Sequence, residues 1–131
     1  MPTHKDDLKN LTKLGGDRET TRKLEAFPNH GGGNMEITLH CIEFTCRCPL
    51  TGQPDYAEIE ITYVPDKFVV ESKSFKLYLE TYREQGVFHE HLAVDIGQDF
   101  IKYTKPKSVV VTVRFNIRGG IAIDAAWKYK K

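Results

Sequence analysis

The sequence predicts an α+β fold: an antiparallel four-stranded sheet with two helices on one face. Alternating apolar residues mark strands on both sides of a central region, and that region has the spacing of two amphipathic helices. The predicted order is strand, strand, helix, helix, strand, strand, and this grouping is typical of α+β proteins. A chain of 131 residues fits one domain.

The first two predicted strands follow residue 35. Apolar residues alternate over 35–41 and change parity at Ile42, which predicts a β-bulge between His40 and Ile42. Over 57–63, apolar residues alternate with glutamate and threonine, as expected for a strand with one buried face.

Two helices are predicted next, over 72–85 and over about 91–103. Gly86 suits a left-handed residue at the end of the first helix, and Pro106 follows the second. The residues expected to face the sheet are spaced three and four apart: Phe75, Leu79 and Tyr82 in the first helix, and Leu92, Ile96 and Phe100 in the second.

The last two predicted strands cover 109–117 and 121–127, and the segment Arg118-Gly-Gly120 turns the chain between them. The sheet would have free edge strands, which invite pairing with other copies of the chain. We therefore expect a homo-oligomer in which a ring of subunits closes into a barrel. Residues 1–34 are rich in charged and hydroxyl side chains and are expected to form a partly ordered N-terminal arm, and 35–131 the single domain.

The composition excludes several classes of protein. The net charge is +1, which argues against a protein dedicated to nucleic acids. No apolar run approaches the roughly 20 residues that span a membrane, and the N-terminus has no apolar core of a secretory signal. Three cysteines do not make a disulfide framework, so free thiols in a reducing cytoplasm are expected.

Cys48 is the candidate nucleophile. It lies at the end of a predicted strand, beside Pro49 and before a turn with Gly52 and Pro54, where a ligand can reach the thiol. Asp55 follows this turn and is the candidate proton donor. Taken alone, the cysteine fits a small core residue and the aspartate a turn residue.

Further candidates lie downstream. Lys73 and Lys76 share one face near a helix N-terminus and could bind phosphate, although a solvated face is usual for lysines. The turn at Arg118-Gly-Gly120 could bring its backbone and the Arg118 guanidinium close to a bound ligand. It could equally be an ordinary hairpin turn. Glu90 could accept hydrogen bonds from the amidine-like edge of a ring, and Phe88 could stack on that ring. Alternatively, Glu90 is a carboxylate favoured at the start of a helix by the helix dipole.

A zinc site is an alternative use of some of these side chains. Cys46, Cys48, His89 and His91 offer two thiols and two imidazoles. A single residue separates the two cysteines, however, and structural zinc sites usually have two to four. No metal is therefore predicted.

The segment Glu71-Ser-Lys-Ser-Phe-Lys-Leu-Tyr78 resembles the signature of the nitrile reductases of the queuosine pathway, the QueF type. Three further segments match: Cys48-Pro-Leu-Thr-Gly-Gln-Pro-Asp55, Phe88-His-Glu90 and Arg118-Gly-Gly120. These enzymes reduce 7-cyano-7-deazaguanine to 7-aminomethyl-7-deazaguanine with two NADPH, in the synthesis of a modified tRNA nucleoside. The likeness is strong from Cys48 to Asp124 and weak over 24–29.

The resemblance implies a role for each candidate residue. Cys48 forms a thioimide with the nitrile carbon, and Asp55 provides the proton. The substrate-binding residues implied are Val70, Glu71, Ser72, Phe88, His89 and Glu90. The NADPH-binding residues implied are Lys73, Lys76, Arg118, Gly119 and Gly120. The resemblance also implies the tunnelling fold (T-fold) for the catalytic domain at 35–131, with active sites at subunit contacts.

Two other functions stay open from the sequence. The first is an amidinotransferase of the related tRNA-modifying branch, which uses the same cysteine and aspartate but is expected to lack the lysine signature and to be more basic. The second is a zinc-dependent T-fold enzyme that acts on a pterin. A binding module without catalysis would leave the pair Cys48 and Asp55 unexplained.

Overall fold

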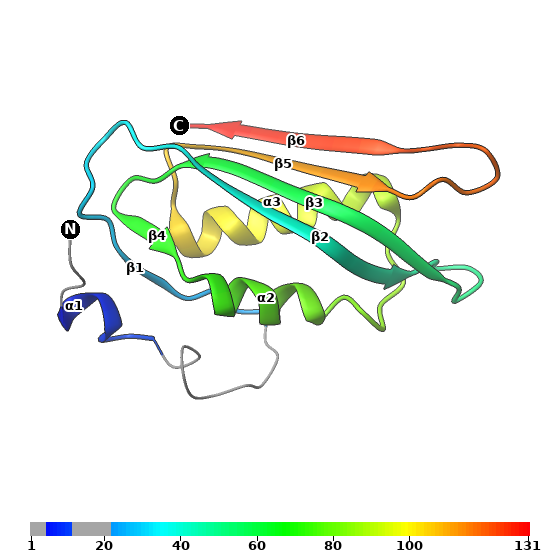
Figure 1. Cartoon of the computed structure of the whole chain (residues 1–131), viewed down its shortest axis with the longest axis horizontal. Helices are drawn as coiled ribbons and strands as arrows, with labels where there is room; N and C mark the ends of the chain where they lie inside the picture. The colour runs from blue at the N-terminus through cyan, green and yellow to red at the C-terminus, as the bar shows by residue number, and fades with distance from the viewer. Residues whose placement is uncertain (1–4, 12–21) are drawn as a thin grey trace.

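The computed structural model describes residues 5–11 and 22–131 of the chain. Helices α2 (Ser72–Glu80) and α3 (His89–Thr104) cover one face of an antiparallel sheet (Figure 1). The four strands of this sheet, in spatial order, are β2 (Ile37–Arg47), β3 (Pro54–Val64), β5 (Ser108–Phe115) and β6 (Asp124–Lys130). The α+β fold predicted from the sequence is therefore confirmed.

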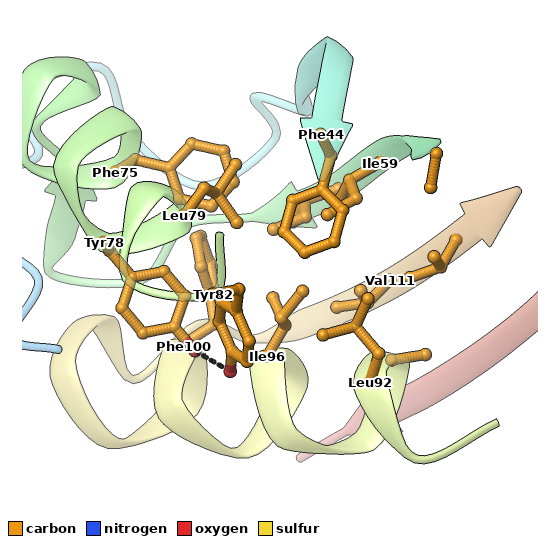
Figure 2. Packing of buried hydrophobic residues seen from close by; sticks show 14 of the residues in the cluster. Phe44, Ile59, Phe75, Tyr78, Leu79, Tyr82, Leu92, Ile96, Phe100 and Val111 are labelled. Atoms are coloured by element: carbon orange, nitrogen blue, oxygen red, sulfur yellow. Dashed lines mark hydrogen bonds between the residues drawn. The ribbon is translucent and has the colours of Figure 1, made fainter. Parts of the chain in front are cut away.

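The core lies between this sheet and the two helices. Alternate side chains of β3 and β5 are buried, and so are all six helix residues that were predicted to face the sheet. Figure 2 shows Phe44, Ile59 and Val111 of the sheet meeting the helix side chains in one layer. Burial of each large apolar side chain stabilises a fold by roughly 1.5–3 kcal/mol. This layer therefore fixes the strand ends from which the candidate site is built.

The predicted bulge in β2 is confirmed. The pairing register of β2 with β3 shifts between Cys41 and Phe44. Beyond the shift, Phe44 and Cys46 are buried, whereas Ile42 is exposed. The extra residue thus turns Phe44 and Cys46 toward the helices and sets the direction in which the strand leaves the sheet before Cys48.

The predicted end of the first helix is wrong. α2 ends at Glu80, and residues 81–84 continue as turns, in which the N–H groups of Thr81, Tyr82 and Arg83 each donate to the carbonyl three residues back. Gly86 does not adopt a positive φ. A Cβ atom at Gly86 would instead lie 2.7 Å from Cα of Pro49, so glycine is needed for a close approach of two backbones. The second helix begins at His89, two residues earlier than predicted, and ends at Thr104, where Lys105 follows as a left-handed cap residue (φ 48°).

The last strand also differs from the prediction. β5 ends at Phe115 and β6 begins at Asp124, three residues later than expected. The alternation of Ile121 and Ile123 suggested a strand, but both belong to a longer connection in which Gly119 and Gly120 have φ values of 58° and 79°.

A small second sheet was not predicted. β1 (Ala26–Pro28) pairs with β4 (Phe68–Val70), and Leu24 just before it joins the core. Strands of three residues are too short to show an alternating pattern. A short helix, α1 (Lys5–Leu8), also falls within the predicted arm, while residues 1–4 and 12–21 of that arm lie outside the described residues. Among the described residues, no helix has the length and apolar character to cross a membrane.

Candidate active site

Cys48 lies in a tight turn between β2 and β3. Its N–H donates to the carbonyl of Gln53 (2.8 Å), and the N–H of Gly52 donates to the carbonyl of Cys48 (2.9 Å). Gly52 has a φ of 74°, which a side chain would disfavour. The Arg47 guanidinium donates to the carbonyl of Gly52 (3.0 Å) and to the carboxylate of Glu84 (2.6 Å). The turn is therefore held by its own backbone and by a neighbouring ion pair.

The thiol of Cys48 differs from that of Cys46. The hydroxyl of Thr51, then the N–H groups of Thr51 and Leu50, and last the Arg118 side chain lower the pKa of Cys48 to about 7. Burial raises the pKa of Cys46 to about 11. Because the thiolate is the nucleophilic form, these pKa values favour Cys48 over Cys46 as a nucleophile near neutral pH.

Asp55 occupies the start of β3, opposite Cys46, and its side chain is only 1% exposed. Arg118 Nη1 donates to Asp55 Oδ1 (2.8 Å), and His89 Nε2 lies 3.1 Å from Asp55 Oδ2. A carboxylate is buried at low cost only when it is paired in this way. The structure thus brings four predicted residues into one group, which we call the thiol cluster: Cys48, Asp55, His89 and Arg118.

His89 is the first residue of α3. Its ring stacks on Phe115 of β5, with centroids 3.6 Å apart and an angle of 8° between the planes. This stacking and the contact with Asp55 fix the direction of the imidazole. Phe88 precedes it and is exposed, and Glu90 is exposed in the first turn of the helix. Both are therefore available to a ligand at this end of α3.

The turn after β5 carries Arg118. Arg118 and Ile121 exchange two backbone hydrogen bonds of 3.0 Å, and the positive φ values of Gly119 and Gly120 allow the chain to reverse between them. Arg118 Nη2 also donates to Gln53 Oε1 (3.1 Å). A hollow of about 410 Å³ beside this turn is lined in part by His89, Arg118 and Gly119.

Five predicted residues lie elsewhere, at the start of α2. Glu71 is buried and caps the helix: its carboxylate accepts from the N–H of Ser74 (2.8 Å) and from that of Lys73 (2.9 Å). Val70 is buried and donates its N–H to the hydroxyl of Tyr63 (3.1 Å). We call this set the α2 group: Val70, Glu71, Ser72, Lys73 and Lys76.

The thiol cluster and the α2 group occupy opposite ends of α2. The segment after α2 reaches the Cys48 turn, because Arg47 and Gly86 form a β-bridge, whereas the α2 group begins the helix. A helix of nine residues is about 13 Å long, and Figure 1 shows its start far from the turn between β2 and β3. Within one chain, the predicted site residues therefore form two separate sets.

A groove between β2 and α2 adjoins the α2 group. Its volume is about 390 Å³, and it is lined by Ser72 and Lys76 together with Arg83, His40 and apolar side chains such as Phe75. The groove also carries Glu43 and Glu80. Cationic donors beside apolar walls are the chemistry that the phosphate and ring of a nucleotide require.

The four residues of the zinc alternative do not converge. His89 contacts Asp55, and the ring of His91 packs on Phe88 with centroids 5.9 Å apart. In the part of the chain that the structure describes, no three His, Cys, Asp or Glu side chains come together as metal ligands.

Two residues of the site were missed in the sequence. Thr51 makes the largest contribution to the lowered pKa of Cys48. Gln53 accepts a hydrogen bond from the backbone N–H of Cys48 and another from the Arg118 side chain. A hydroxyl three residues after a cysteine in a Gly- and Pro-containing turn was the available signal, because such a turn folds back on its first residue.

Comparison with known proteins agrees with the resemblance. The model of the family described as QueF-like protein matches residues 54–131. The NADPH-dependent 7-cyano-7-deazaguanine reductase of Syntrophus aciditrophicus is 47% identical over 130 residues, which are 98% of this chain and 93% of that one. The protein of the same name from Frankia casuarinae is 52% identical over 122 residues, 92% of this chain and 97% of that one.

A solved structure shares the fold. The archaeosine synthase QueF-Like, in its apo form, superimposes with a TM-score of 0.69 and 25% identity, over 74% of this chain and 95% of that chain. The T-fold implied by the resemblance is thereby confirmed. With a family model that matches more than half of its length and relatives that match nearly all of it, this chain belongs to the QueF-like protein family.

Proposed function

We propose that this protein is an NADPH-dependent reductase that converts the nitrile of 7-cyano-7-deazaguanine to the aminomethyl group of 7-aminomethyl-7-deazaguanine, in queuosine biosynthesis. The observation that carries the proposal is the thiol cluster: a thiol with its pKa lowered to about 7, next to a buried carboxylate held by Arg118 and His89. The names of the relatives with 47% and 52% identity support it.

The first step uses Cys48. Its thiolate attacks the nitrile carbon, an S–C bond forms, one π bond of the nitrile breaks, and the nitrogen takes up a proton to give a thioimide. The proton for adduct formation comes from solvent. Asp55 and His89, which share a hydrogen bond, are proposed to supply the later proton, which activates the thioimide nitrogen for hydride transfer. Because Asp55 is buried, water does not compete readily with this transfer.

The reduction requires a hydride donor. NADPH, when bound, supplies hydride for two successive two-electron reductions, of the thioimide and of the imine left when the thiol departs. Lys76 of the groove and the neighbouring Lys73 are the proposed phosphate ligands, and the donor set of the groove suits an anionic dinucleotide. Arg118, Gly119 and Gly120 are proposed to approach the cofactor from the β5–β6 turn.

The substrate is a flat ring with an amidine-like edge. Phe88 is exposed and positioned to stack on it, and Glu90 to accept its N–H groups, next to His89 of the thiol cluster. Val70, Glu71 and Ser72 are proposed to complete the pocket. Because these three lie at the other end of α2, we propose that a second copy of the chain provides them.

Two observations support a homo-oligomer. Strands β2 and β6 are the outer strands of the sheet, and the turns around the thiol cluster present apolar side chains that are 61–90% exposed. These side chains are Leu50, Phe88, Ile117 and Ile121. A barrel of several subunits would cover them and bring the α2 group of one chain to the thiol cluster of the next. The cytoplasmic location, the lack of nucleic-acid and membrane partners, and the division into arm (1–34) and catalytic domain (35–131) stay predictions.

The test is conversion of the substrate by purified protein. We expect 7-aminomethyl-7-deazaguanine as product, with two NADPH oxidised for each nitrile consumed, measured by chromatography and by absorbance. A protein that forms a covalent adduct with the nitrile but oxidises no NADPH would instead fit the amidinotransferase alternative. Zinc-dependent conversion of a pterin, with no conversion of the nitrile, would favour the pterin alternative.

A further inference from the structure

Arg118 connects two turns that are far apart in the sequence. From the β5–β6 turn, its guanidinium reaches the β2–β3 turn and donates to Asp55 Oδ1 (2.8 Å) and to Gln53 Oε1 (3.1 Å). These two residues flank Pro54, where the Cys48 turn becomes β3. The carbonyl of Gln53 in turn accepts the N–H of Cys48 (2.8 Å). The Arg118 side chain therefore restrains the Asp55 carboxylate directly and, through Gln53, the backbone of Cys48.

The position of Arg118 is set by the backbone. Gly119 and Gly120 adopt φ values of 58° and 79°, and the paired hydrogen bonds between Arg118 and Ile121 close the turn. The Arg118 side chain is 45% exposed, whereas that of Asp55 is 1% exposed. The guanidinium thus covers the carboxylate on its solvent side.

Of the two arginines near the Cys48 turn, Arg118 is the one that pairs with Asp55. The titratable and charged groups of the surrounding elements are Cys46 and Arg47 of β2, Asp55 of β3, Glu84 after α2, His89 of α3 and Arg118 of the β5–β6 turn. Arg47 is already bonded to Glu84 and to the carbonyl of Gly52. Arg118 is therefore the guanidinium that balances Asp55.

We infer that Arg118 is a positioning residue for the nucleophile, which clamps the segment from Gln53 to Asp55 beside Cys48. This role deepens the proposed function and rests on it, because it concerns the same thiol, and it is independent of any contact between Arg118 and a cofactor. In the free protein, loss of Arg118 leaves Asp55 as an unbalanced negative charge near the thiol. The thiolate then becomes less stable and Cys48 less reactive at neutral pH.

The experiment measures alkylation of Cys48 by iodoacetamide as a function of pH, in the full-length protein without nitrile or NADPH. Trypsin cleaves after Arg47 and Lys67, and the peptide 48–67 contains Cys48 as its only cysteine, so mass spectrometry reports this thiol alone. The variants are Arg118→Ala, Arg118→Lys, which keeps the charge, and Arg118→Gln, which keeps hydrogen-bond donors. Arg114→Ala is the control, because Arg114 lies on β5 and pairs with Glu60 (3.2 Å).

For Arg118→Ala we expect a higher midpoint pH and alkylation at pH 7 that is about threefold slower or more. Arg118→Lys should recover most of the rate, Arg118→Gln less, and Arg114→Ala should match the wild type. A wild-type midpoint in Arg118→Ala, or an equal shift in Arg114→Ala, would overturn the inference. Failure of the wild-type protein to form an adduct with the nitrile would overturn the proposed function instead, and the alkylation profiles would still decide the role of Arg118.

Discussion

His89 Nε2 lies 3.1 Å from Oδ2 of Asp55, although the two residues are 34 positions apart in the chain. The contact joins the first residue of α3 to the second residue of β3, and the stacking of the imidazole on Phe115 fixes its plane. A buried carboxylate and an imidazole in this arrangement can pass a proton to a group bound at Cys48.

Replacement of Asp55 by Asn should slow reduction by about 100-fold or more while the covalent adduct still forms. The amide keeps an acceptor for Arg118 but cannot supply a proton. Stopped-flow absorbance of the adduct and of NADPH separates the two steps, and thermal unfolding shows whether the variant is folded. Turnover at the wild-type rate would mean that Asp55 only shapes the turn.

The rate of adduct formation should rise with pH through about 7 and then level off, because the thiolate of Cys48 is the attacking form. Thr51→Val removes the hydroxyl that contributes most to this lowered pKa. The midpoint should therefore move to higher pH, and the rate at pH 7 should fall roughly threefold to tenfold, with little change well above the new midpoint.

Thr45→Val is the matched control for this prediction, because the hydroxyl of Thr45 donates to the carbonyl of Cys46 on β2 (3.5 Å). It should leave the midpoint unchanged. If Thr51→Val also leaves it unchanged, the turn does not activate the thiol.

Lys73→Ala combined with Lys76→Ala should raise the KM for NADPH far more than the KM for NADH. The 2′-phosphate is the feature that NADPH has and NADH lacks, and a charge-assisted contact to it would be lost. Steady-state kinetics with both cofactors measure this. An equal rise for the two would place the lysines at the pyrophosphate or assign them to the fold.

Mixed oligomers of Cys48→Ala and Glu71→Gln should recover activity that neither variant has alone. Some sites would combine an intact thiol cluster from one chain with an intact α2 group from another. Glu71→Gln keeps a side-chain oxygen as the helix cap, so the fold should persist. Subunit exchange followed by an activity assay is the measurement.

The control is a mixture of Cys48→Ala with Asp55→Asn, in which every thiol cluster carries one defect. It should recover nothing. Equal recovery in both mixtures, or a fully active monomer in sedimentation, would contradict sites shared between chains.

The strands and the turn that begins at Cys48 were predictable because their signals are local. β3 and β5 alternate strongly since one face of each is buried, and the parity change at Ile42 follows from the bulge. The turn at Cys48 was predictable from Gly52 and Pro54, and the segment that follows Cys48 carries the family resemblance. In these regions neighbouring residues alone determine the pattern.

The remaining features depend on contacts between distant segments. Arg118 and Asp55 are 63 positions apart, and nothing in either segment indicates that the guanidinium reaches the carboxylate. Gly86 looked like a helix end, but the backbone of Pro49 is what requires it. The separation of the α2 group from the thiol cluster became visible only once the sheet had placed both, since the resemblance assigned residues of both sets to the substrate without implying how far apart they lie in one chain.

The most direct test of the central claim is the intact mass of the protein after incubation with 7-cyano-7-deazaguanine in the absence of NADPH. We predict that the wild type and Cys46→Ala gain one substrate mass per chain, located on the peptide 48–67, and that Cys48→Ala gains none and oxidises no NADPH. An adduct that persists on Cys48→Ala, or full NADPH oxidation by that variant, would contradict the assignment of Cys48 as the nucleophile.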